Sequence, residues 1–143
     1  MRLGVFSAME VAASGLSAER TRMNTIASNL ANARTTRTEA GGPYKKLDPV
    51  FVAVPMGEGL PTGNDAAVSL VKVQSIAQDK RDPQMVYEPG HPDADARGYV
   101  RYPNVNVVEE MVNMITASRA YEAGVTSLES IKSMAKTAIG IGR

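Results

Sequence analysis

The distribution of proline constrains this 143-residue chain more than any other feature. All eight prolines lie in residues 34–103, whereas residues 1–33 and 104–143 contain none. Because proline breaks the interior of a helix, the two proline-free end segments are the parts that can form the longest uninterrupted helices. Positive and negative charges nearly balance within each of the three parts. The partition is therefore one of conformation and not of electrostatics.

The first segment carries an apolar repeat that is typical of a long helix. One row recurs every seven residues and consists of Met9, Leu16, Met23 and Leu30, with Ala12, Ile26 and Ala33 three residues after three of its members. This spacing predicts a coiled-coil seam along a helix over residues 1–33, which Glu19 interrupts. Gly15 costs such a helix about 1 kcal/mol relative to alanine, so it indicates a bend or the close approach of another helix.

The last segment predicts a second, longer helix. Asn106 can cap its start, and Glu109 three residues later resembles a capping box. Its first row is Val107, Met114, Tyr121, Leu128 and Ala135, and its partner row is Met111, Ser118, Val125, Lys132 and Ile139. Gly140 and Gly142 are expected to end the helix.

Helices of these lengths do not fit inside a compact body. At about 1.5 Å per residue they measure about 45 and 52 Å, whereas a compact domain of this size is only about 30 Å across. Pairing along a seam buries only one stripe of each helix. Small residues lie on the other faces, for example Ala27, Ala31, Ala120 and Ala123. We therefore expect an elongated protein that completes its packing with neighbouring chains.

The middle segment has the pattern of irregular β-structure. Strands are predicted within residues 44–54, over 68–77, at 85–87 and at 99–102, where β-branched and aromatic residues concentrate. Residues 57–63 are rich in glycine but lack the Gly-Lys-Ser/Thr of a phosphate-binding loop, so they predict a linker. Residues 88–98 predict a turn-rich loop.

One cluster in that loop has side chains of the kind that bind metals. His91, Asp93 and Asp95 are close in sequence. A calcium-binding loop needs further oxygen ligands, but Arg97 and Asn104 occupy two of the ligand positions. The sequence therefore predicts a structural loop here, and it predicts no catalytic residue, no metal site and no cofactor.

Composition excludes several classes of function. The net charge is only +1, whereas nucleic-acid-binding proteins neutralise many phosphates with basic side chains. The absence of cysteine excludes disulfide bonds and thiolate metal sites. No apolar run approaches the ~18 residues of a membrane helix. Ser7 and Glu10 interrupt the first apolar stretch too early for a secretory signal.

Two sets of helical residues have two interpretations each. Asn29 and Asn32 lie about one turn apart near the end of the first helix, and they either help to end it or hydrogen-bond across a helix junction. Five methionines lie on or beside the seams, where they form either ordinary core or an adaptable interface. They are Met9, Met23, Met111, Met114 and Met134.

Several blocks of sequence carry a family resemblance. The stretch SNLAN at residues 28–32 is the core of a longer motif over residues 14–33. This motif resembles the amino-terminal signature of bacterial flagellar rod and hook proteins. Further blocks resemble the proximal rod members of that family, namely residues 41–46, 87–95, 98–100, 102–112 and 118–122. Arg34 departs from the family pattern, which more often has a small or polar residue there.

The resemblance implies a mainly α-helical fold with a smaller β region. Residues 1–33 and 104–143 would pair as an antiparallel coiled coil in an inner domain, and residues 34–103 would form a β-rich outer region. The residues expected at the helix seam or at subunit interfaces are Met9, Leu16, Met23, Ile26, Asn29, Leu30, Asn32, Val107, Met111, Met114, Tyr121, Val125, Leu128 and Ile131.

The same resemblance implies a structural, non-enzymatic function. Such subunits stack helically with copies of themselves and with other proximal rod proteins, and together they form the drive shaft that transmits torque in the flagellar basal body. They leave the cytoplasm through the flagellar export apparatus without a cleavable signal peptide, and the rod crosses the periplasm. The resemblance implies no cofactor, no nucleic-acid partner and no membrane span.

The residues alone leave two other functions open. A helical hairpin can serve as a soluble adaptor or export chaperone, which would form a small closed oligomer. A cell-wall glycan hydrolase needs only two carboxylates, although no pair in this chain has a recognisable local signature.

Overall fold

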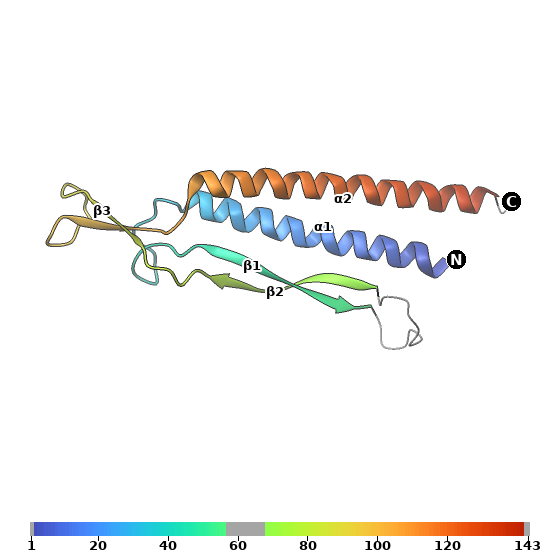
Figure 1. Ribbon diagram of the computed structural model, residues 1–143, viewed down its shortest axis with the longest axis horizontal. Helices are drawn as coiled ribbons and strands as arrows, with labels where there is room; N and C mark the ends of the chain where they lie inside the picture. Colours follow the sequence, from blue (N-terminus) through green and yellow to red (C-terminus); the bar gives the residue numbers. More distant parts are fainter. Residues whose placement is uncertain (1, 57–67, 142–143) are drawn as a thin grey trace.

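The computed structural model describes residues 2–56 and 68–141 of an elongated chain (Figure 1). Helix α1 (Arg2–Ala31) and helix α2 (Val107–Ile141) run side by side in opposite directions, so both chain ends lie at one end of the molecule. The predicted fold class, a long helix pair with a smaller β region, is confirmed. The linker expected at residues 57–63 lies outside the described residues.

The two helices approach each other closely at Gly124. A Cβ atom added to Gly124 would lie 2.8 Å from Leu16 Cδ2, so the absence of a side chain makes room for the leucine. A Cβ atom added to Gly15 would meet no atom of the described chain within 4 Å. The close approach within the chain is therefore at Gly124, and the expectation of one at Gly15 is wrong within the chain. The alternative expectation, a bend at Gly15, stays a prediction.

The face of α2 that meets α1 differs in part from the expected face. Its first inward row, half-buried, is Met114, Tyr121, Leu128 and Ala135. Its second inward row is Glu110, Ala117, Gly124 and Ile131, which lies one position away from the expected partner row. Met111, Lys132 and Ile139 of that expected row are exposed. Small residues at 117 and 124 let the helix backbones come together, so close packing selects this row over a more apolar one.

Asn106 caps the start of α2, as its sequence position predicts. Asn106 Oδ1 accepts the N–H of Val108 at 3.0 Å and that of Glu109 at 3.3 Å. At the other end the expectation that Gly140 stops the helix is wrong, because α2 continues through this residue with helical backbone geometry. Gly142 lies outside the described residues.

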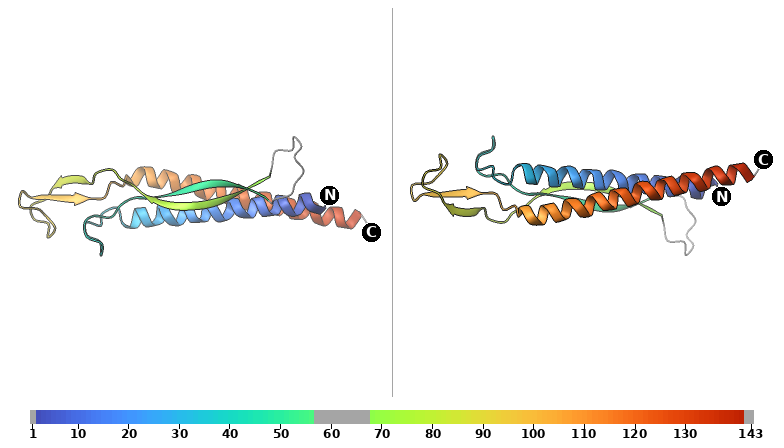
Figure 2. Two further views of the ribbon diagram at one scale, coloured as in Figure 1. Left: turned by 90° about the horizontal axis from the view of Figure 1, so that it is seen from below. Right: turned by 90° about the horizontal axis from the view of Figure 1, so that it is seen from above.

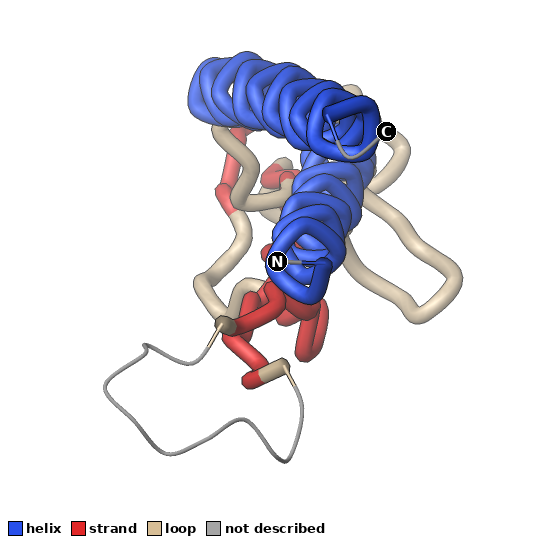
Figure 3. The backbone as a smooth tube through the Cα atoms, turned by 90° about the vertical axis from the view of Figure 1, so that its right-hand side faces the viewer, coloured by secondary structure: helices blue, strands red, loops and turns tan. Residues whose placement is uncertain are grey.

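Strands β1 (Leu47–Pro55) and β2 (Ser69–Gln78) form an antiparallel hairpin with an irregularity between Val50 and Phe51. The hairpin lies along α1 on the side away from α2, so α1 is the middle of three layers (Figures 2 and 3). Ser14 Oγ of α1 accepts the N–H of Val71 in β2 at 3.1 Å. Both strands lie within one to three residues of their predicted bounds.

Strands β3 (Gln84–Tyr87) and β4 (Tyr99–Tyr102) form a second antiparallel hairpin beyond the helix pair (Figure 1). The rings of Tyr87 and Tyr99 pack edge to face with centroids 5.3 Å apart. Gly98 has a φ of +82°, and a Cβ atom there would lie 2.9 Å from the Tyr87 ring. Glycine is therefore required at this turn. The two predicted strands are confirmed.

The folded chain exposes an unusually large surface. Its accessible area is 10568 Å², whereas a compact monomer of this mass exposes about 7,100 Å². Large apolar side chains are exposed on both helices and both hairpins. No helix in the described part of the chain is long and apolar enough to cross a membrane. The predicted domain limits, after residues 33 and 103, stay a prediction.

Candidate assembly site

A buried polar cluster lies where the end of α1, the start of α2 and the start of β1 meet. Asn29 of α1 and Glu110 of α2 are each 1% exposed, and Lys46 is buried directly before β1. Buried polar groups destabilise a fold unless they are hydrogen-bonded. We name Asn29, Tyr44, Lys46 and Glu110 the polar junction.

Asn29 uses the whole hydrogen-bonding capacity of its side chain. Its Nδ2 donates to the carbonyl oxygen of Leu47 at 2.8 Å and to Glu110 Oε2 at 2.9 Å. Its Oδ1 accepts the N–H of Leu47 at 2.9 Å and the hydroxyl of Tyr44 at 3.0 Å. An amide offers two donors and one oxygen with two lone pairs, so this set is complete. One side chain thereby fastens α1 to both α2 and β1.

Lys46 and Glu110 form a buried ion pair next to that amide. Lys46 Nζ lies 3.1 Å from Glu110 Oε1, 3.6 Å from Asp48 Oδ1 and 3.9 Å from Glu109 Oε1. Burial lowers the pKa of the Lys46 ammonium, but the hydrogen bond to Glu110 and the three carboxylate charges outweigh that effect, and the pKa is raised overall. Lys46 therefore stays charged.

Asn32 has a different role from Asn29. Its Nδ2 donates to the carbonyl oxygen of Ser28 at 2.9 Å, and its Oδ1 accepts the hydroxyl of Thr35 at 3.1 Å. Both bonds are local and lie where α1 ends. The sequence left two roles open for Asn29 and Asn32, and each residue has one of them. Asn29 hydrogen-bonds across a helix junction, and Asn32 helps to end the helix.

The predicted seam and interface residues fall into two groups. Those buried or half-buried in the folded chain are Met9, Leu16, Met23, Ile26, Asn29, Leu30, Asn32, Met114, Tyr121, Val125, Leu128 and Ile131. Val107 and Met111 are instead 45% and 55% exposed. The fold thus brings the first group inward and leaves the second on the surface. Their roles in subunit contacts stay a prediction.

Sequence reasoning did not single out Tyr44, Lys46 and Glu110, the other members of the polar junction. Glu110 had a usable signal, because it falls three residues after Val107, where a seam position is expected. For Tyr44 and Lys46 the sequence has no comparable signal outside the family resemblance. Their bonds join positions far apart in the chain, and the bond between Asn29 and Glu110 spans 81 positions.

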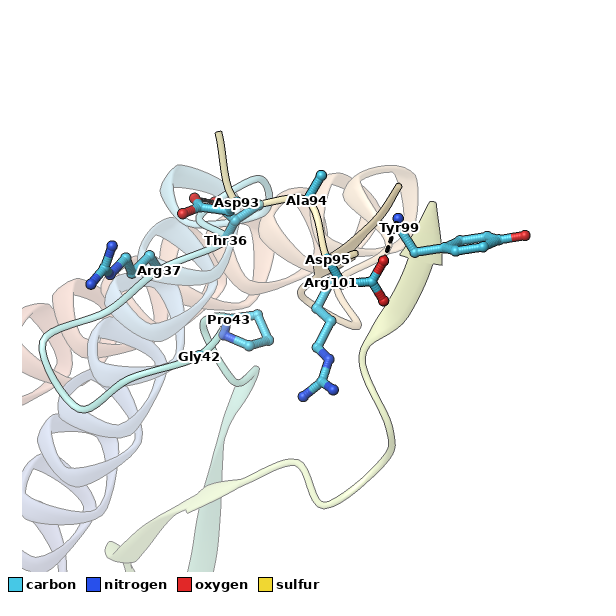
Figure 4. Close-up of a pocket in the computed structure, with 9 residues that line it drawn as sticks. All are labelled: Thr36, Arg37, Gly42, Pro43, Asp93, Ala94, Asp95, Tyr99 and Arg101. Carbon is cyan, nitrogen blue, oxygen red and sulfur yellow. Dashed lines mark hydrogen bonds between the residues drawn. The ribbon is translucent and has the colours of Figure 1, made fainter. Parts of the chain in front are cut away.

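The loop between β3 and β4 uses its polar side chains to fold itself. Asp95 Oδ1 accepts the N–H of Tyr99 at 2.9 Å (Figure 4). It also accepts the N–H of Arg97 at 2.8 Å. These two backbone bonds lower the pKa of the Asp95 carboxyl. Thr36 donates to Asp93 Oδ2 at 2.7 Å, which ties the loop to the segment after α1. The described residues contain no group of three or more potential metal ligands.

The described part of the chain also carries exposed apolar side chains at both ends of the helix pair. Near the start of α2 they are Val108, Met111, Val112 and Ile115. At the end where both termini lie they are Phe6, Met134, Ile139 and Ile141. Single exposed apolar residues are normal on protein surfaces, but contiguous groups mark contact sites.

Two flagellar families match parts of the chain. Residues 9–37 match the family described as flagella basal body rod protein. Residues 96–141 match the family described as flagellar basal body rod FlgEFG protein C-terminal. The two matched segments contain Asn29 and Glu110, the helical members of the polar junction.

Relatives are similar over nearly the whole chain. The flagellar basal-body rod protein FlgC of Borreliella burgdorferi is 45% identical, over 97% of this chain and 98% of its own length. The protein of the same name in Salmonella typhimurium is 40% identical, over 99% of this chain and 100% of its own length. The protein of the same name in Bacillus subtilis is 38% identical, over 96% of this chain and 98% of its own length.

Proposed function

The chain belongs to the FlgC family of flagellar basal-body rod proteins, and we propose that it stacks helically with other subunits into the drive shaft that transmits torque. It is a structural subunit of the basal-body rod. Its partners in the proposal are copies of itself and the other proximal rod proteins. The proposal includes no catalytic step, because assembly and stiffness need none.

The large exposed surface is the observation that carries the proposal. The chain exposes 10568 Å², about 3,500 Å² more than a compact monomer of its mass. A stable contact covers about 800 Å² on each partner, so this excess is enough for several neighbours. An open helical assembly also needs unlike, complementary faces on each subunit. The exposed groups at the two ends of the helix pair supply such faces.

The polar junction supports the mechanical part of the proposal. A shaft transmits torque only if its subunits resist twisting, and fully satisfied buried polar networks hold elements in one arrangement. Asn29, Lys46 and Glu110 fix the two helices and β1 against one another at a single point. We therefore assign the junction the role of keeping the helix pair in register under load.

The proposed route to the rod is export in an unfolded state through the flagellar export apparatus, without a cleavable signal peptide, to the part of the rod that crosses the periplasm. The three layers can then form after export. The hairpin β1–β2 covers only one side of α1, so the remaining sides of the helix pair find their cover on neighbouring subunits.

Purification of basal bodies tests the proposed function. The gene is deleted, and an epitope-tagged copy of the chain is supplied from a plasmid. We expect loss of swimming on deletion, restoration by the tagged copy, and the tag in purified basal bodies. Light scattering of the purified chain against concentration adds a second test. Open-ended growth agrees with a rod subunit, whereas a plateau at the dimer together with absence from basal bodies favours an adaptor or chaperone.

A further inference from the structure

Glu19 is a charged residue in the middle of the apolar seam of α1. It lies seven residues after Ala12 and seven before Ile26, so all three share one row of the helix. Ala12 is half-buried and Ile26 is 5% exposed, and the side chain of Glu19 is only 24% exposed. The fold therefore draws a carboxylate into a row whose neighbours along the helix are apolar.

The Glu19 carboxylate gains little that offsets this burial. Its Oε2 atom is buried, and no donor group of the described residues lies within hydrogen-bond distance of that atom. Its ion-pair partner is Arg22 on the same helix, whose Nη1 lies 3.7 Å away. An ion pair between two partly exposed side chains of one helix contributes little to stability. The stability of the helix pair therefore does not explain a glutamate at this position.

Helix α2 of the same chain is a partner that tolerates Glu19. Leu16 packs on Gly124, and the two helices are antiparallel (Figure 1). Glu19 lies almost one turn further along α1, so it is level with the part of α2 between Ala117 and Gly124. The inward row of α2 has small residues at both of these positions. Small neighbours leave room for the longer glutamate side chain, which keeps part of its access to solvent.

Helix α1 of a second copy is a partner that Glu19 disfavours. A helix with an apolar seam can pair with an identical helix along that seam. In a parallel pair each residue of the row faces its own copy, so the two Glu19 carboxylates would meet. In an antiparallel pair the two rows of the seam face each other, and each Glu19 would lie against a large apolar side chain such as Leu16. The first arrangement brings like charges together, and the second buries a carboxylate without a partner.

We propose that Glu19 selects the helix that pairs with α1, favouring α2 of the same chain over α1 of a second copy. The carboxylate costs stability in both pairings, but it costs more where it faces its own copy or a large apolar side chain. The selection acts during folding, because α1 must find a helix at the far end of the chain while the identical helices of other copies compete for it. It concerns the pairing of helices within one chain, so it does not depend on how the folded subunits stack.

Glu19→Leu tests the selection in the full chain, and Glu10→Leu is the matched control. Glu10 is exposed on the same helix, so the control makes the same change of charge outside the seam. Sedimentation velocity is measured at a concentration at which the natural chain is a monomer, and circular dichroism checks that each variant is folded. We expect Glu19→Leu to dimerise with an affinity roughly tenfold or more above that of the control and of the natural chain, because no carboxylate is then buried in the pair of α1 helices.

Disulfide formation identifies the surface that the dimer uses, because the natural sequence has no cysteine. In the Glu19→Leu chain, Met23→Cys should form a disulfide between copies if the α1 helices pair in parallel. A mixture of Glu19→Leu chains with Met23→Cys and with Ala12→Cys should form one if they pair in antiparallel. The same cysteines in the natural background should form none, because α2 then covers the seam.

Three results overturn the proposal. One is a Glu19→Leu chain that stays as monomeric as the control. Another is equal dimerisation of both variants, which means that the loss of any negative charge on α1 is enough. The third is a dimer that forms neither disulfide, which means that it uses another surface.

If Glu19→Leu does not fold, Glu19→Gln decides the question, because it keeps the size of the side chain and removes the charge. Dimerisation of Glu19→Gln above the level of Glu10→Gln supports the proposal, and equal levels overturn it. These measurements use the purified chain alone. Absence of the natural chain from basal bodies would therefore contradict the proposed function and leave the selection by Glu19 to be decided by sedimentation.

Discussion

Asn29 connects more parts of the fold than any neighbouring side chain in the polar junction. Its amide bonds to the backbone of Leu47, the hydroxyl of Tyr44 and the carboxylate of Glu110. Removing one partner from such a network leaves the others buried without hydrogen bonds, which costs more than the lost bonds themselves. The junction therefore specifies how α1, α2 and β1 fit together as well as stabilising them.

Asn29→Ala should lower the free energy of unfolding by about 2–4 kcal/mol, because the substitution strands several buried polar groups at once. Urea unfolding followed by circular dichroism measures this change. Asn32→Ala is the matched control, since it removes the same side chain from a local capping role and should cost about 1 kcal/mol. Equal losses for the two variants would show that the junction is no more important than the helix end.

Lys46 should make stability fall at high pH. Its pKa is raised above the usual 10.5, because the hydrogen bond and the carboxylates around it outweigh the effect of burial. A group with a raised pKa stabilises the fold below its unfolded-state pKa and ceases to do so as the pH rises through its folded-state pKa. The free energy of unfolding should therefore drop more steeply above pH 10.5 in the natural chain than in Lys46→Met. Parallel urea titrations across this range measure it, and identical slopes would contradict the assignment.

At the scale of elements, α1 is held between two neighbours. Helix α2 covers one side, with Leu16 packed over Gly124, and the hairpin β1–β2 covers another, tied by Ser14 and Val71. The two contacts differ in kind. The helix contact depends on small residues that admit a close approach, whereas backbone N–H groups of Val71 and Leu47 in the hairpin donate to side chains of α1.

Gly124→Val tests the close approach. The larger side chain must displace Leu16, so we expect the free energy of unfolding to fall by about 1–3 kcal/mol more than in Gly15→Val. Both variants carry the same change in helix propensity, and Gly15 has open space around it. Thermal or urea unfolding of the pair isolates the contact. The same loss in both variants would mean that the helices do not meet at residue 124.

Leu128→Asp tests whether the helix pair is needed for assembly. Leu128 is half-buried in an inward row of α2, and a carboxylate there would lie in an apolar contact without a partner. We expect the variant to be missing from basal bodies and the cells to stop swimming, whereas Leu128→Met should behave like the natural chain. Immunoblots of purified basal bodies and swimming assays provide the readout. Normal incorporation of Leu128→Asp would refute the role of this row.

At the scale of the whole molecule, the chain is a long three-layered body with a small hairpin beyond one end (Figures 1 and 3). Few apolar side chains in the described residues are fully buried, and the accessible surface is far above that of a compact monomer. In the proposed function, neighbouring subunits cover the helix faces that remain exposed. The inward rows of α1 and α2 stabilise the subunit itself.

The long helices and the short strands could be predicted because their signals are local. Proline-free heptads, the cap at Asn106 and the β-branched runs each act within a few residues. The close approach of the two helices at Gly124 could not be predicted, because it depends on which residue of α1 lies opposite Gly124 in the folded chain. The burial of Glu110 with Lys46 and Asn29 was missed for the same reason, although a charge at a seam position is a usable warning. The position of the hairpin along α1 has no signal in the helix pattern.

Hydrogen exchange measured on a verified monomer and on purified basal bodies tests the central claim most directly. The claim is that the paired helices find their remaining cover on neighbouring subunits. We expect weak protection of the amides toward the terminal end of the pair in the monomer, stronger protection near Asn29 and Glu110, and strong protection of both helices throughout in basal bodies. Strong and uniform protection along both helices in the monomer, unchanged on assembly, would contradict it.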